Sequence, residues 1–242
     1  MGHGLCCQQT SKMNRHVCSL LLAILALVGG AWTALAHDTL GHAQAIVAVY
    51  QPTTRLHPGP AELDYYRGVT YGKRGHWQDA VAAFQEGIRL KPDYAEAHSG
   101  LGEAYGKLGL LPDAVAALQQ AIRLKPKLAV AHNNLGVAYS TLGRWQEAAA
   151  AFQQATRLQP EDAQAHYNLG VAYTNLRRLP EAVAAFQQAT RLQPKDAQAH
   201  YNLGVTYLML GDQGSAREEY TILKPLDQHL ATALLRSLSK ES

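Results

Sequence analysis

One spacing constrains the fold of this chain more than any other feature. Prolines recur at intervals of 34 residues, at Pro92, Pro126, Pro160 and Pro194. Longer identities keep the same register: residues 151–160 and 185–194 both read AFQQATRLQP, and residues 162–171 and 196–205 both read DAQAHYNLGV. Repeats of about 20 to 50 residues are typical of arrays in which each unit packs against its neighbours. The chain is therefore predicted to be such an array.

Each unit is predicted to contain two short amphipathic helices. In the fourth unit, small and apolar residues fall at helical spacing from Ala165 to Leu176 and again from Ala182 to Ala189. A glycine marks the end of the first helix in four units, at Gly75, Gly109, Gly143 and Gly211. Glycine accepts the left-handed conformation that often ends a helix. Arg177 takes this place in the fourth unit, so its backbone is predicted to be left-handed as well.

Other residues predict where the helices begin, end and pack. Pro112 and Pro180 are expected at the start of second helices, and Asp162 and Asp196 are expected to cap the first helices that follow them. Pro225 is expected to end the last second helix early. Glycines at equivalent positions are expected where two helices approach closely, with the tyrosines three residues later packed beside them. They are Gly68, Gly102, Gly136, Gly170 and Gly204.

The pattern Leu169-Gly170-x-x-Tyr173, followed by Ala182, Phe186, Ala189 and Pro194, resembles the tetratricopeptide-repeat (TPR) signature at its characteristic spacing. The resemblance covers residues 61–230. It implies an all-α fold, an α-solenoid with a right-handed superhelix of five helix-turn-helix units and a C-terminal capping helix. The units are expected at residues 61–94, 95–128, 129–162, 163–196 and 197–226, with the capping helix and tail at 227–242.

The first 36 residues are predicted to be a signal peptide or an N-terminal membrane anchor. Lys12 and Arg15 precede an apolar run over residues 17–28, and residues 34–36 read ALA, a small-x-small cleavage site. Residues 17–36 also contain about the 20 residues that span a bilayer, so an uncleaved anchor is the alternative. The chain therefore resembles exported TPR proteins of the bacterial type, placed in the periplasm or outside the cell, or anchored to the membrane. Residues 37–60 are interpreted as a linker with room for a short helix.

A binding site is expected on the concave face, which the first helices of such a stack line. The resemblance places six residues there: Asn133, Asn134, Asn168, Asn202, Tyr167 and Tyr201. Asn134, Asn168 and Asn202 are in phase and form an expected asparagine ladder, similar to those of O-linked N-acetylglucosamine transferase and kinesin light chain. An amide carries a donor and an acceptor, so the ladder can pair with the backbone of an extended peptide. The alternative is that these asparagines are solvated residues copied by duplication.

The N-terminal half of the same face carries charge. Three glutamates are expected there near two tyrosines and two lysines: Glu62, Glu96 and Glu103 near Tyr65, Tyr66, Lys73 and Lys107. This half is predicted to favour a basic stretch of the partner. Ser99 and Val137 stand where the chaperone-binding branch of the family needs charge or amide groups, which disfavours a carboxylate clamp.

Several kinds of chemistry are disfavoured. The 22 basic and 19 acidic residues nearly balance, which argues against nucleic acid as a partner. No cysteine follows Cys18, so the repeats lack thiolate metal ligands. Histidines recur in phase at His98, His132, His166 and His200. Successive units are roughly 10 Å apart, too far to share one ion, so packed histidines with one hydrogen-bonded nitrogen are expected.

No catalytic motif is found, and the pair Glu218-Glu219 is expected on a solvated helix face. The prediction is a non-enzymatic adaptor without a cofactor or metal that binds a protein or peptide partner. The alternative is a structural subunit of a multiprotein envelope complex that docks through its convex face or its ends.

Overall fold

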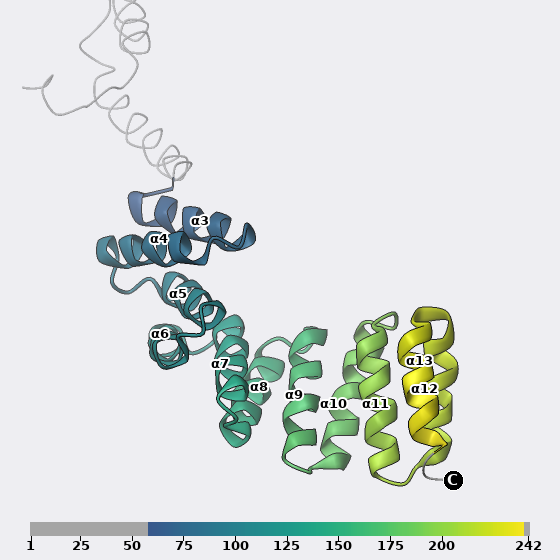
Figure 1. The fold of residues 1–242 in the computed structure, drawn as a ribbon. Helices are drawn as coiled ribbons and strands as arrows, with labels where there is room; N and C mark the ends of the chain where they lie inside the picture. The colour runs from purple at the N-terminus through teal and green to yellow at the C-terminus, as the bar shows by residue number, and fades with distance from the viewer. Residues whose placement is uncertain (1–57, 240–242) are drawn as a thin grey trace, which may run out of the picture. The chain divides into compact units, whose positions relative to one another are not determined.

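The computed structural model describes residues 58–239, and the predictions for residues 1–57 and 240–242 lie outside them. The described residues form helices joined by short turns (Figure 1). The helices are α3 (Pro60–Lys73), α4 (Trp77–Leu90), α5 (Ala95–Lys107), α6 (Leu111–Leu124), α7 (Ala129–Thr141), α8 (Trp145–Leu158), α9 (Ala163–Asn175), α10 (Leu179–Leu192), α11 (Ala197–Met209), α12 (Gln213–Leu226) and α13 (Gln228–Leu238). None of the described helices is long and apolar enough to cross a membrane.

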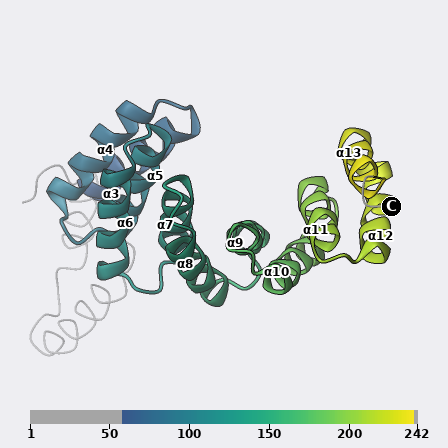
Figure 2. The ribbon, with the colours of Figure 1, turned by 60° about the horizontal axis from the view of Figure 1, so that its bottom comes forward.

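The helices pack as successive pairs, each consisting of a first helix and the second helix that follows it (Figure 2). Along residues 58–239, first helices of neighbouring units also contact each other, whereas second helices of neighbouring units do not. The first helices α3, α5, α7, α9 and α11 therefore line the inner side of the stack, which we call the inner face. Helix α13 packs on both α11 and α12. The predicted all-α solenoid of five helix pairs with a capping helix is confirmed.

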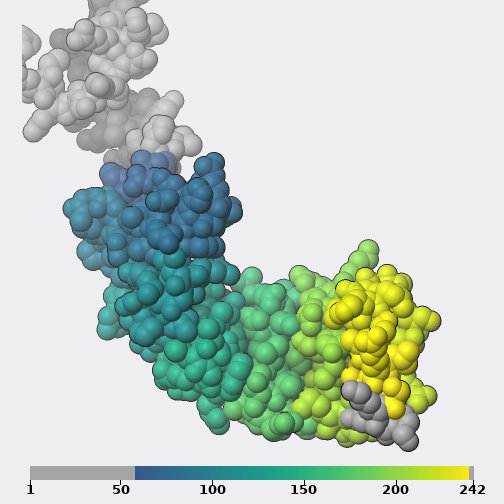
Figure 3. Space-filling view, in the orientation of Figure 1, coloured from purple at the N-terminus to yellow at the C-terminus, as the bar shows by residue number. Residues whose placement is uncertain are grey.

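The core forms where an aromatic or leucine side chain covers a glycine. A Cβ atom added at Gly170 would lie 2.6 Å from the Phe186 ring, and one at Gly136 would lie 2.6 Å from the Phe152 ring. Leu118 takes the place of the ring above Gly102. The expected close approach at the glycines is thus confirmed, but the space is filled from the second helix rather than by the tyrosines. Figure 3 shows successive units in contact with one another in chain order.

The tyrosines instead join one unit to the next. Tyr105 accepts a hydrogen bond from Gln85 Nε2 at 3.0 Å, and Tyr139 accepts one from Gln119 at 3.1 Å. The same bond recurs twice more, from Gln153 to Tyr173 and from Gln187 to Tyr207. A glutamine on each of the first four second helices therefore bonds to the first helix of the following unit.

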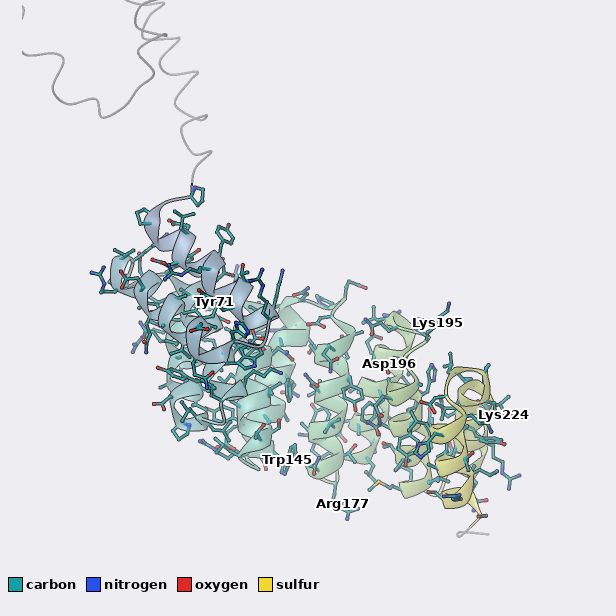
Figure 4. The ribbon with its side chains drawn as sticks, turned by 45° about the horizontal axis from the view of Figure 1, so that its top comes forward. Tyr71, Trp145, Arg177, Lys195, Asp196 and Lys224 are labelled. Carbon is teal, nitrogen blue, oxygen red and sulfur yellow. The ribbon has the colours of Figure 1, made fainter. Side chains whose placement is uncertain are left out.

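The turns inside the units confirm the predicted backbone. The four turn glycines have φ between +72° and +80°, and Arg177 has φ of +59°. Arg177 lies at the edge of the stack with its side chain in solvent (Figure 4). A side chain in this left-handed region is strained, because its Cβ crowds the backbone.

Replacing Arg177 by glycine should raise the melting temperature by about 2–4 °C. The reason is the removal of roughly 1 kcal/mol of left-handed strain in a domain of this size. Thermal unfolding followed by circular dichroism measures the change. Arg178→Gly, at the neighbouring residue with an ordinary φ, is the control and should not stabilise. An unchanged or lower melting temperature for Arg177→Gly would contradict the strain.

The helix ends agree with the sequence except at Pro225. Asp162 and Asp196 each accept hydrogen bonds from two backbone amides of the next helix, as predicted. Pro225 does not end α12 early, because α12 spans 14 residues like the other second helices. The proline lies in the final turn and removes only one helical hydrogen bond there. The chain ends the helix at Asp227, whose side chain caps α13.

The recurring histidines confirm the packed interpretation. Nε2 of His98, His132, His166 and His200 lies 2.9–3.1 Å from the carbonyl oxygen of the proline six residues earlier. Because a carbonyl oxygen only accepts, each Nε2 carries the proton. Among residues 58–239, no cluster of His, Cys, Asp and Glu could hold a metal ion.

His200 has a second partner that the sequence interpretation missed. Its Nδ1 lies 2.6 Å from Glu219 Oε2, and both side chains are buried. The prediction that Glu218 and Glu219 share a solvated face is therefore wrong for Glu219. The signal was available, since Glu219 is in phase with alanines that are buried in every earlier unit.

Candidate functional site

The predicted site residues all lie on first helices and are half-buried. Asn133 and Asn134 are on α7, Tyr167 and Asn168 on α9, and Tyr201 and Asn202 on α11. Each pair sits one turn into its helix, so the three pairs follow one another across the inner face. The structure thus places the six predicted residues on one surface.

The asparagines are held by hydrogen bonds between units. Asn168 Nδ2 donates to Asn133 Oδ1 at 3.1 Å, and Asn202 Nδ2 donates to the Tyr167 hydroxyl at 2.8 Å. Gln164 donates to Asn168 Oδ1 from the preceding turn, at 3.0 Å. The ladder residues therefore bond to the position before the ladder in the previous unit, a register that in-phase spacing alone does not reveal.

These bonds orient the ladder amides but leave part of their hydrogen-bonding capacity unused. A carboxamide has two N–H donors and two acceptor lone pairs, and each contact above uses one of them. The second donor and the second lone pair of Asn168 and Asn202 are left for other partners. Their orientation is set in advance, which lowers the entropy cost of binding.

Tyr167 is part of the same fixed framework. Its ring meets the Phe186 ring edge-on, with centroids 5.8 Å apart. Burial raises the pKa of its hydroxyl, an effect that the hydrogen bond from Asn202 partly offsets. The hydroxyl thus stays protonated at neutral pH and supports the Asn202 amide.

Two hollows lie in the N-terminal half of the inner face. The first, of about 430 Å³, lies between α3 and α5, and we call it the N-terminal pocket. Its apolar lining includes Tyr65, Val69, Trp77, Phe84 and Val130. The second, of about 310 Å³, lies between α5 and α7 and includes Asn134 and Val137. Trp77 and Val130 were not singled out from the sequence, because their meeting depends on how neighbouring units stack.

The predicted acidic residues of this half differ in their partners. Glu62 is paired with Lys91 at 3.3 Å, and Glu96 is paired with Lys125 at 2.7 Å. The hydrogen bond from Lys125 lowers the pKa of Glu96 below its ordinary value. The pKa of Glu62 is also lowered, mainly by a backbone hydrogen bond and then by the hydrogen bond from Lys91. Glu103 lines both hollows, is exposed, and forms no ion pair with another described residue.

Two tyrosines near these carboxylates have raised pKa values. Burial raises the pKa of Tyr65, and the charges of Glu96 and Glu103 raise it further. Burial and neighbouring acidic groups raise the pKa of Tyr94 to about 12. Burial is thus the main cause of both raised pKa values, and the neighbouring acidic groups add to it.

Comparison with known protein families gives a match over most of the chain. The family model of the C-terminal domain of cilia and flagella-associated protein 70, a TPR domain, matches residues 23–228. The chain belongs to this TPR family. No curated protein is significantly similar to it in sequence.

Solved TPR structures resemble the TPR array closely. MamA from Desulfovibrio magneticus RS-1 is 25% identical with a TM-score of 0.64, covering 71% of this chain and 97% of that one. YrrB, described as a TPR protein with an unusual peptide-binding site, is 23% identical with a TM-score of 0.62, covering 72% and 90%. TTC0263, a thermophilic TPR protein from Thermus thermophilus, is 22% identical with a TM-score of 0.57, covering 74% and 98%. Family membership places the TPR array among protein–protein interaction scaffolds.

Proposed function

We propose that the TPR array binds an extended peptide segment of a partner protein along its inner face, without catalysis. The observation that supports this is the ladder of Asn134, Asn168 and Asn202, half-buried on three successive first helices. The last two amides are held by hydrogen bonds and retain further donors and acceptors. The peptide-binding site attributed to YrrB is consistent with this use of the fold.

The spacing of the ladder suits an extended chain. Packed helices are roughly 10 Å apart, and an extended strand rises about 3.3 Å per residue. Successive asparagines of the ladder would therefore contact peptide residues about three positions apart. Three rungs would engage about seven residues. A net of about 0.5–1.5 kcal/mol per hydrogen bond, with side-chain contacts added, corresponds to micromolar affinity.

Replacing Asn134, Asn168 and Asn202 together by alanine should weaken binding about tenfold for every peptide bound by the wild type. The ladder would contact backbone groups, so the loss should not depend on peptide sequence. Fluorescence anisotropy with a panel of labelled ten-residue peptides of mixed sequence measures the effect.

The control for this experiment is Gln146→Ala, which truncates an exposed residue on the second helix α8 and should leave the affinity unchanged. Circular dichroism must show that both variants keep their helix content. Equal affinity of the wild type and the triple variant would reject the ladder as the site.

A second candidate function is a structural subunit that docks through an end of the stack. The observation in its favour is the exposure of Leu63 and Tyr66 on α3, at 55% and 57%. A partner held this way would be retained by the asparagine triple variant. A pull-down from an envelope extract with wild type and triple variant therefore separates the two functions.

We also propose that the protein works in the cell envelope, exported to the periplasm or outside the cell, or anchored by residues 17–36. This proposal rests on the sequence of residues 12–36, which lie outside the described residues.

A further inference from the structure

Small residues gather in the N-terminal half of the inner face. Two positions are small in the second unit, where the first unit has Tyr65 and Tyr66, and a third position is glycine in both of the first two units; the later units carry larger side chains at all three. Ser99 is in phase with Asn133, Tyr167 and Tyr201; Gly100 is in phase with Asn134, Asn168 and Asn202; Gly72 and Gly106 are in phase with Ser140, Thr174 and Leu208. The two hollows lie where these side chains are missing.

The N-terminal pocket is the larger of the two hollows and is suited to an apolar side chain. Trp77, Tyr65 and Phe84 supply aromatic surface, and Val130 at its border is 49% exposed. Exposed apolar surface in a concave site favours an apolar ligand group, because contact removes both surfaces from water. Nothing among the described residues fills this space, since a hollow of about 430 Å³ remains.

Two carboxylates line this pocket, Glu96 and Glu103, and Glu103 interrupts an otherwise apolar row. Glu103 is in phase with valines in all the other units, at Val69, Val137, Val171 and Val205. Glu62 and Glu96 are neutralised by Lys91 and Lys125, whereas Glu103 has no ion pair with a described residue. Lys107, one turn further along α5, holds its ammonium 6.0 Å from the centre of the Trp77 ring.

We infer that the N-terminal pocket selects a peptide with an apolar side chain and, two residues away, an arginine or lysine that pairs with Glu103. This inference rests on the proposed binding of an extended peptide by the inner face. In an extended chain, residues i and i+2 point to the same side, so both side chains can face α5 together. The ladder then contacts the backbone of the same peptide, while the N-terminal pocket recognises its sequence.

Four labelled, end-capped ten-residue peptides on a glycine-serine background test the inference. They carry Phe and Arg two residues apart, Phe and Glu, Ser and Arg, or Ser and Glu. The Phe/Arg peptide should bind most tightly to the wild-type protein. Changing Arg to Glu should weaken binding about fivefold, as expected for a partly exposed ion pair, and changing Phe to Ser about tenfold, as expected for lost apolar burial.

Two protein variants, each introducing the residue that other units carry at the equivalent position, should remove these preferences separately. Glu103→Val should abolish the preference for Arg over Glu and keep that for Phe. Val130→Gln, matching Gln164 and Gln198, should reduce the preference for Phe and keep that for Arg. Gln146→Ala is the control, because it truncates an exposed residue on the second helix α8, outside both hollows, and it should leave the ranking unchanged.

The outcomes distinguish this inference from the proposed function. If the four peptides bind equally, or if Glu is preferred to Arg, the selectivity is overturned while peptide binding stands. The same holds if Glu103→Val leaves the Arg preference intact. If none of the four binds, and the mixed-sequence panel does not bind either, both proposals fail.

Discussion

Alanine in place of Phe186 should lower the free energy of unfolding by about 3–5 kcal/mol, the largest effect expected for a single substitution in the array. The Phe186 ring is 1% exposed and occupies the space above Gly170. Its edge also supports Tyr167, which holds Asn202. The truncation therefore leaves a cavity at the centre of the fourth unit.

Urea unfolding followed by circular dichroism measures this loss, and a leucine at the same position serves as the control. Leu118 stands at the equivalent place in the second unit, above Gly102. Phe186→Leu should consequently cost less than about 1.5 kcal/mol, because it preserves most of the volume. A loss below about 1 kcal/mol for Phe186→Ala would mean that neighbouring units collapse into the space.

Replacing Glu219 by glutamine should destabilise the fifth unit at pH 6 by about 2 kcal/mol and remove a pH dependence that the wild type shows. In the wild type, Glu219 and the Pro194 carbonyl both accept from His200, so both imidazole nitrogens carry protons. The hydrogen bond and the charge of Glu219 raise the pKa of His200, more than burial lowers it. A buried hydrogen bond between two charged groups contributes about 1.5–3 kcal/mol.

The direction of the pH dependence follows from the raised pKa. The stabilisation is fully present below the pKa of an unfolded histidine, about 6.5, and is lost as the pH rises through the raised pKa of the folded state. Urea unfolding between pH 5.5 and 9 should therefore show the wild type losing its advantage over Glu219→Gln as the pH increases. The nearby charge of Asp196 is present in both proteins and cancels in the comparison. A difference that stays constant with pH would show that the buried histidine is neutral.

The repeat period determines most of the backbone, and for this reason the sequence predicts it well. Each unit repeats the same local signals, so the glycine turns, the aspartate caps and the unusual backbone of Arg177 could all be assigned before the structure was known. Pro225 could not, because its effect depends on whether it falls in the last turn of a helix, and the boundary is set by Asp227.

The candidate site is less predictable, because it depends on side chains that meet across units. The family resemblance placed the six candidate residues, and they lie on first helices, but the bond from Asn168 to Asn133 links positions that are out of phase by one residue. The N-terminal pocket is lined by the small residues Gly72, Ser99 and Gly100, which leave space between α3 and α5. Deviations from the repeat, including Glu103 and Glu219, are the positions where the sequence carries information that the family pattern does not.

The recurring bond from a second-helix glutamine to the tyrosine of the following unit has an evolutionary consequence. The same hydrogen bond joins each unit to the next, so one more copy of residues 163–196 would form this bond with the unit before it and with the unit after it. The terminal helix α13 lacks this tyrosine, so growth has to occur upstream of it. Gene duplication can thus lengthen the reach of the protein by whole modules, and the near-identical stretches 151–171 and 185–205 record such an event.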